Sequence, residues 1–144
     1  MYKHNPENGV WMRPDSRPVA YSEGADAEAR LYQIICAAED RRTLSPELAA
    51  QISDWSTEYH FSPARHTLLR PLAIHNGQRV LELGCGTGAL TRHLGEIGAR
   101  VDAVEGSLPR ARIAAERCRD LPGVSVFFDD LTAFESPDPY DWVF

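Results

Sequence analysis

The chain has 144 residues, of which 43% are apolar and 25% are charged, a balance typical of a folded globular protein. It carries 21 acidic and 15 basic residues, and this net charge of −6 disfavours a protein that holds nucleic acid through its phosphates. No apolar run approaches the roughly 20 residues that a membrane span requires, and the first residues lack an apolar signal core. We therefore expect a cytoplasmic protein without a membrane span.

Three cysteines and five histidines are scattered along the sequence without a CxxC or HExxH pattern. An odd, sparse set of cysteines is poor material for disulfides, and structural zinc usually uses paired ligands. The sequence therefore indicates a reducing compartment and no metal site.

The first half of the chain predicts helices behind a leader. Residues 1–25 combine prolines and glycines with polar residues, and we expect a flexible leader there. Apolar residues at helical spacing predict a helix over 26–41. Serine–proline pairs at 45–46 and 62–63 are typical of helix starts, so a helix is expected after each. Residues 26–78 are accordingly interpreted as a helical segment.

From residue 79 onward, strands and helices alternate. Short apolar runs predict strands over 80–83, 101–105, 124–128 and 140–144, with helices over 89–97 and 107–119 between the first three. Gly98 is placed to end the first of these helices in a left-handed conformation. Such alternation implies an α/β fold with a mostly parallel sheet, of which the chain holds the first four strands. Because helices cover both faces of such a sheet, we also expect the chain to be the N-terminal part of a larger protein.

A glycine-rich turn joins the first of these strands to the helix that follows. Gly84, Gly86 and Gly88 would bring backbone N–H groups against a ligand at the helix N-terminus. The spacing also fits a dinucleotide fingerprint, with Glu105 near the offset of a ribose-binding acid. Glu82, two residues before the loop, favours a different ligand, because its carboxylate would repel a pyrophosphate and attract an ammonium or a sulfonium. S-adenosylmethionine carries both of these cationic groups.

Four ordered segments resemble the class I S-adenosylmethionine-dependent methyltransferase family. They are 80–88 for the first motif, 101–107 for the second strand, 124–131 for the third and 140–143 for the start of the fourth. The resemblance implies a Rossmann-like fold over 79–144, preceded by helices that form a lid over 26–78. It also implies S-adenosylmethionine as the cofactor.

The resemblance implies a set of cofactor-binding residues. They are Glu82, Gly84, Cys85, Gly86, Gly88, Glu105, Gly106, Asp130 and Leu131. The loop glycines and Glu82 would lie at the methionine part, and Glu105 would accept hydrogen bonds from both ribose hydroxyls. Asp130 would accept from the adenine amino group, with Asp129 an open alternative one residue away, and the pair could instead cap a turn.

The sequence thus predicts an enzyme that transfers a methyl group from S-adenosylmethionine to a small molecule, lipid or sugar. No catalytic residue is assigned, because the family's acceptor-side residues commonly follow the fourth strand; this also leaves open whether this piece is active alone. Two alternatives stay open, a cofactor-binding module without turnover and an NAD(P)-dependent oxidoreductase, which Glu82 disfavours. Tyr59 and His60 either reach over the cofactor or pack a helix end, and Arg65 is expected on a solvated helix face.

Overall fold

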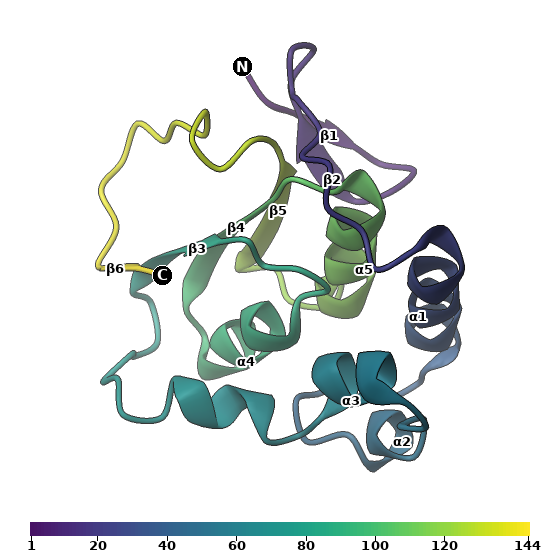
Figure 1. Cartoon of the computed structure of the whole chain (residues 1–144). Helices are drawn as coiled ribbons and strands as arrows, with labels where there is room; N and C mark the ends of the chain where they lie inside the picture. The colour runs from purple at the N-terminus through teal and green to yellow at the C-terminus, as the bar shows by residue number, and fades with distance from the viewer.

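Six strands form one sheet in the computed structural model of the chain, which describes residues 1–144 (Figure 1). The strands are β1 (Lys3–Asn5), β2 (Val10–Met12), β3 (Arg79–Leu83), β4 (Arg100–Glu105), β5 (Val124–Phe128) and β6 (Trp142–Val143). Their order across the sheet is β1-β2-β5-β4-β3-β6, and only the β1–β2 pair is antiparallel. The predicted α/β, Rossmann-like and mostly parallel sheet is therefore confirmed.

Helices pack in layers against this sheet. They are α1 (Ala25–Ala37), α2 (Pro46–Ala49), α3 (Trp55–Phe61), the 3₁₀ helix η1 (Arg65–Leu68), α4 (Ala89–Ile97) and α5 (Leu108–Cys118). α4 and α5 pack on each other and on the strands, and α1 packs on α5 (Figure 1). Gly98 ends α4 with a φ of 90°, which confirms the predicted left-handed cap. None of the helices is both long enough and apolar enough to cross a membrane.

Two buried clusters hold these layers together. The larger one lies between the strands and helices α4 and α5, where alanines such as Ala111 and Ala114 allow α5 to approach the sheet closely. The smaller one joins α1, α2 and α3 to α5 through Leu31, Phe61 and Ile113. Full burial of such large side chains contributes about 1.5–3 kcal/mol each. Helices α1, α2 and α3 are therefore attached to the strand-and-helix half through α5, whereas η1 packs on α4.

The structure corrects the expectation of a flexible leader over residues 1–25. Strands β1 and β2 form a hairpin within this range, and β2 extends the sheet by pairing Val10 with Val126 and Trp11 with Phe127. Val10 is fully buried. The strands have three residues each, too few for a recognisable alternation, and the partner of β2 lies more than a hundred residues away in the sequence.

Element boundaries in the helical segment also differ from the expectation. The helix that begins at Pro46 stops at Ala49, and α3 begins separately at Trp55. Asp54 starts α3 with a capping box, in which its carboxylate accepts from the N–H of Thr57 at 2.8 Å. The third expected helix is only the 3₁₀ turn η1, and the strand expected over 140–144 is reduced to β6.

A buried carboxylate fastens the N-terminal hairpin to the sheet. Asp129 directly follows β5, is fully buried, and forms an ion pair with the Nε atom of Arg13 at 2.6 Å. The hydroxyl of Tyr2 donates to the same carboxylate. Side chains from both ends of the hairpin thus meet one acid at the carboxyl end of β5.

Replacement of this acid provides a test of the attachment. Asp129→Ala is expected to lower the free energy of unfolding by about 2–4 kcal/mol, because Arg13 and Tyr2 lose their buried partner. Asp130→Ala is the matched control: its carboxylate accepts only from Thr132 within a turn, so we expect a loss below about 1 kcal/mol. Urea unfolding measures both, and equal losses would contradict an anchoring role for Asp129.

Candidate functional site

The glycine loop between β3 and α4 adopts a conformation that only glycine accommodates without strain. Gly84, Gly86 and Gly88 have φ angles of 78°, 57° and 79°. The N–H groups of Gly84 and Cys85 donate to the carbonyl of Val104 at 2.8 and 3.1 Å, which pins the loop to β4. A Cβ atom on Gly88 would lie 3.0 Å from the Cα atom of Ala114 on α5, so this glycine also allows α4 and α5 to pack closely.

Glu82 is a buried acid at the carboxyl end of β3. Its side chain lines the cavity beside the loop, is 6% exposed, and accepts a hydrogen bond from the hydroxyl of Thr91 at 2.7 Å. The pKa of Glu82 is raised to about 7, chiefly by burial and also by the nearby Glu105 carboxylate, while the Thr91 hydrogen bond opposes the shift. A cation in the cavity would favour the ionised carboxylate, so the site attracts positive charge near neutral pH.

Glu105 lies at the end of β4 and holds the loop from the other side. Its two carboxylate oxygens accept from the N–H groups of Gly86 at 2.8 Å and Ser107 at 2.9 Å. A carboxylate has about four acceptor positions, so two of them remain. Gly106 is covered by the N-terminal segment, because the N–H of Val19 donates to its carbonyl at 2.8 Å and a Cβ atom there would collide with the Val19 side chain.

The third predicted acidic position follows β5. Asp129 is committed to Arg13 and Tyr2, whereas Asp130 is partly exposed and accepts from the N–H and hydroxyl groups of Thr132. Leu131 approaches the glycine loop, since a Cβ atom on Gly84 would lie 3.8 Å from its Cδ1 atom. Of the two aspartates, only Asp129 is therefore paired with buried groups of the protein, and the side chain of Asp130 is the one that a ligand could contact.

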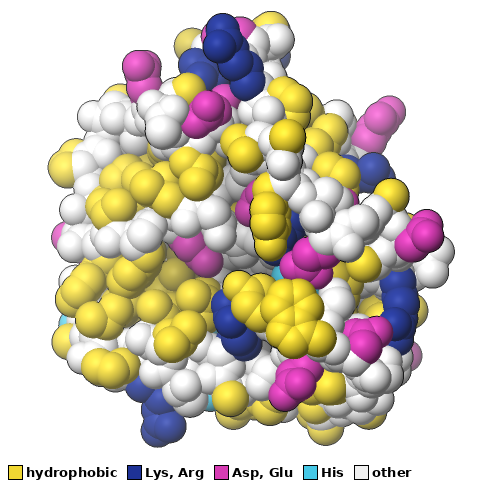
Figure 2. All heavy atoms as spheres, in the orientation of Figure 1, with side chains coloured by type: hydrophobic (Ala, Val, Ile, Leu, Met, Phe, Trp, Pro, Cys, Tyr) yellow, Lys and Arg dark blue, Asp and Glu magenta, His cyan; other side chains and the backbone are white.

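A cavity of about 210 Å³ opens beside the glycine loop. Of the predicted residues, Glu82, Gly84, Cys85 and Gly86 line it, whereas Gly88, Glu105, Gly106, Asp130 and Leu131 do not. Tyr59 and His60, for which the sequence left open a place over the cofactor or at a helix end, also line the cavity. The remaining lining residues, for which the sequence predicted no role in the site, are Tyr21, Arg65, Thr87, Ala89, Leu90 and Arg110. The face in Figure 2 is hollowed near its centre, where acidic, basic and histidine side chains meet.

His60 links three segments around this cavity. Its Nε2 atom lies 3.0 Å from the Glu23 carboxylate, and its Nδ1 atom lies 2.7 Å from the hydroxyl of Thr87 in the loop. Burial lowers the pKa of His60, although the neighbouring Glu23 raises it. The neutral ring favoured by burial donates from Nε2 to Glu23 and accepts at Nδ1 from Thr87. Glu23 also lies 3.4 Å from Arg110, so the N-terminal segment, α3, the loop and α5 are joined.

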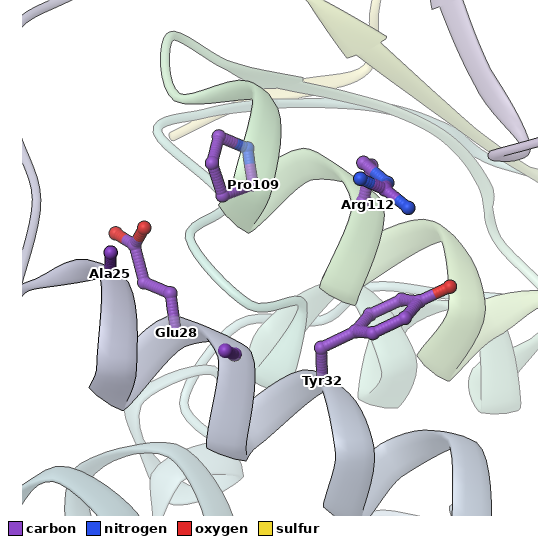
Figure 3. A pocket seen from close by; sticks show the side chains of 6 residues that line it. Ala25, Glu28, Tyr32, Pro109 and Arg112 are labelled. Carbon is purple, nitrogen blue, oxygen red and sulfur yellow. The ribbon is translucent and has the colours of Figure 1, made fainter.

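A second hollow, of about 260 Å³, lies between α1 and α5, away from the loop (Figure 3). Glu28 and Tyr32 of α1 face Pro109 and Arg112 of α5 there. Glu28 already accepts a hydrogen bond from Ser22 at 3.0 Å, and the Arg112 guanidinium lies 5.3 Å from the centre of the Tyr32 ring. This hollow contains none of the predicted site residues. No group of three or more histidine, cysteine, aspartate or glutamate side chains is arranged to hold a metal ion.

The chain is similar in sequence to known methyltransferases over its second half. The family described as "Methyltransferase domain" matches residues 80–144. Pavine N-methyltransferase of Thalictrum flavum subsp. glaucum is 35% identical over 75 residues, which are 49% of this chain and 21% of that protein. Ubiquinone biosynthesis O-methyltransferase of Ruegeria pomeroyi is 49% identical over 51 residues, 33% of this chain and 19% of that protein. The chain thus spans about a fifth of the length of these relatives.

Solved structures share the fold. A coclaurine N-methyltransferase bound to N-methylheliamine and S-adenosylhomocysteine matches with a TM-score of 0.54 and 24% identity, over 85% of this chain and 42% of that one. A mutant of MtNAS in complex with S-adenosylmethionine matches with a TM-score of 0.56 and 22% identity, over 82% and 44%. Three observations point to the same kind of domain. They are the sheet order, the glycine loop between β3 and α4, and the match to the methyltransferase domain family over 80–144. The predicted resemblance to class I S-adenosylmethionine-dependent methyltransferases is therefore confirmed over residues 80–144, which match the methyltransferase domain family.

Proposed function

We propose that this chain provides the S-adenosylmethionine-binding part of a methyltransferase that acts on a small molecule. The observation that carries this proposal is the buried Glu82 carboxylate, which lines a cavity together with the left-handed glycines of the loop. The site residues fit this cofactor, because the carboxylate suits a cation and the bare glycine backbone allows a close approach. The same carboxylate disfavours the pyrophosphate of a dinucleotide.

Each part of the cofactor has proposed partners in the chain. Glu82 and the loop would hold the methionine end, and Glu105 would accept from the ribose hydroxyls with its two remaining acceptor positions. Asp130 and Leu131 would face the adenine, for which Asp129 is unsuited because it is already paired. The bound cofactor supplies a methyl group made reactive by the positive sulfur. The residues of this chain hold and orient it, and they keep water away from it.

The proposed acceptor class is a small molecule. Two of the matched relatives are named for the N-methylation of pavine and of (S)-coclaurine, and others for O-methylation in ubiquinone biosynthesis. The net charge of −6 also disfavours a nucleic acid acceptor. Transfer of a labelled methyl group to amine and phenol acceptors tests this proposal and separates an enzyme from a module that binds without turnover.

Ligand-induced stabilisation tests the cofactor. S-adenosylhomocysteine at a hundredfold excess over its Kd is expected to raise the unfolding midpoint by roughly 5–10 °C, because it binds only the folded chain, whereas NADH is expected to have no effect. Glu82→Gln is expected to weaken binding roughly tenfold through the loss of a charge-assisted contact. Glu58→Gln, which removes an exposed acid from α3, is the control. Stabilisation by NADH alone would contradict the proposal.

The raised pKa of Glu82 predicts that cofactor affinity depends on pH. At pH 6 most of a carboxyl group with a pKa of about 7 is protonated, and at pH 7.5 most of it is ionised. Because a cationic ligand binds the ionised form better, affinity for S-adenosylmethionine should rise severalfold over this window, with proton release at its acidic end. His60 does not produce this effect, because burial favours its neutral form.

Calorimetry in two buffers with different ionisation enthalpies measures both the affinity and the released proton. Glu82→Gln should remove the pH dependence of binding. A pH dependence that persists in this variant would show that another group titrates.

A further inference from the structure

Two histidines from different helices meet where η1 packs on α4. His66 belongs to η1 and His93 belongs to α4, and the centres of their rings lie 4.9 Å apart. The ring planes make an angle of 51°, so the rings are not stacked face to face. Because the two residues lie far apart in the sequence, only the packing of these helices brings them together.

A backbone carbonyl fixes the hydrogen position on His66. Its Nδ1 atom lies 2.5 Å from the carbonyl oxygen of Pro63. Because a carbonyl oxygen only accepts, Nδ1 carries the hydrogen of the neutral ring, and the lone pair lies on Nε2. Histidines that bind metals in proteins usually have this arrangement, in which the nitrogen that does not bind the metal donates to an oxygen and orients the ring.

The other nitrogens of the two rings have no partner and are open to solvent. Neither Nε2 of His66 nor either nitrogen of His93 takes part in a hydrogen bond or an ion pair within the chain. None of them is among the buried polar atoms that lack a partner, so solvent reaches each of them. Burial lowers the pKa of His93, as does the neighbouring His66 ring, while Glu96 raises it. The neutral ring thus has a lone pair to donate.

The separation of the rings fits two imidazoles on one metal ion. With metal–nitrogen distances of about 2.0–2.1 Å and an angle of about 90–110° at the metal, the centres of two imidazole rings lie about 4.5–5.3 Å apart. The 4.9 Å between the rings of His66 and His93 falls within this range. Imidazole nitrogens suit Zn²⁺, Ni²⁺ and Cu²⁺, whereas Mg²⁺ and Ca²⁺ prefer oxygen ligands.

The nearest acid on α4 is already occupied. The Glu96 carboxylate accepts from the side chain of Arg92 at 2.7 Å and from the N–H of Thr43 at 3.0 Å. The protein would therefore supply two ligands, and water or another small ligand would fill the remaining positions. A structural zinc site has four protein ligands, so we expect a weaker and reversible site here.

We propose that His66 and His93 form a two-histidine site for a divalent transition-metal ion such as Zn²⁺ or Ni²⁺, which would fasten η1 to α4. This inference is independent of the proposed function, because neither histidine lines the cavity beside the glycine loop. Once one imidazole has bound the ion, the second one binds within the same molecule, at a high effective concentration. Both histidines should therefore contribute to a single binding event.

Titration of the untagged chain with NiCl₂ by calorimetry tests this site. One ion should bind per chain, and His66→Gln and His93→Gln should each weaken binding at least about tenfold. The double variant should bind no more weakly than either single one, because each substitution already removes the bridge. Two controls, His75→Gln at an exposed histidine and Cys36→Ser at an exposed thiol, should leave the affinity within about twofold. MgCl₂ should not bind at this site.

Thermal unfolding provides a second measurement. Ni²⁺ at a hundredfold excess over its Kd should raise the unfolding midpoint of the unmodified chain and of His75→Gln by roughly 5–10 °C, because the ion binds only the folded site. The same concentration should leave the midpoints of His66→Gln and His93→Gln unchanged. Because each midpoint is also measured without metal, a loss of stability in a variant is distinguished from the loss of a ligand.

The outcomes that would overturn this inference leave the proposed function standing. If the unmodified chain binds no Ni²⁺ at millimolar concentration, the site does not exist. If the affinity persists in either His66→Gln or His93→Gln, or is lost in His75→Gln, the ion is not bridged by the two rings. Binding of S-adenosylhomocysteine is measured separately and without metal, so neither result bears on the cofactor.

Discussion

Strand β4 holds the glycine loop in shape without any ligand. The carbonyl of Val104 accepts from the N–H groups of Gly84 and Cys85, and the carboxylate of Glu105 accepts from that of Gly86. These bonds use backbone groups that a buried turn would otherwise leave unsatisfied. The conformation of the loop is therefore fixed by its neighbouring strand, and every other part of the site is arranged around it. Such preorganisation lowers the entropy cost of binding.

The first half of the chain closes the site from the outside. Its N-terminal segment passes over the carboxyl ends of the strands, where Arg13 pairs with Asp129 and the N–H of Val19 donates to the carbonyl of Gly106. Further along this segment, Glu23 contacts the ring of His60. In the helical segment, α1, α2 and α3 pack on α5 and η1 packs on α4, and residues of α3 and η1 border the cavity. The predicted lid is thus shared between these two helices and an extended segment that precedes α1. Its role over a bound cofactor stays a prediction.

The parts of the molecule that follow local rules could be predicted from the sequence. The alternation of strands and helices, the glycine loop and the glycine that ends α4 all depend on residues close together in the chain. The β1–β2 hairpin could not be predicted, because its pairing with β5 is a distant contact of very short strands. Arg65 was expected in solvent, because spacing alone does not show that η1 turns this residue toward Tyr59 and the cavity. The sequence alone could not show which of Asp129 and Asp130 is available to a ligand, because this depends on the positions of Arg13 and Tyr2, which pair with Asp129.

The contact between Gly88 and Ala114 sets the separation of two helices. With only a hydrogen on one side and a methyl group on the other, α4 and α5 meet at nearly backbone distance. The combined volume at these two positions therefore acts as a spacer, and a larger side chain at either one would move the first turn of α4 away from α5. Evolutionary change at one position should thus be constrained by the size of the residue at the other, even though neither side chain touches a ligand.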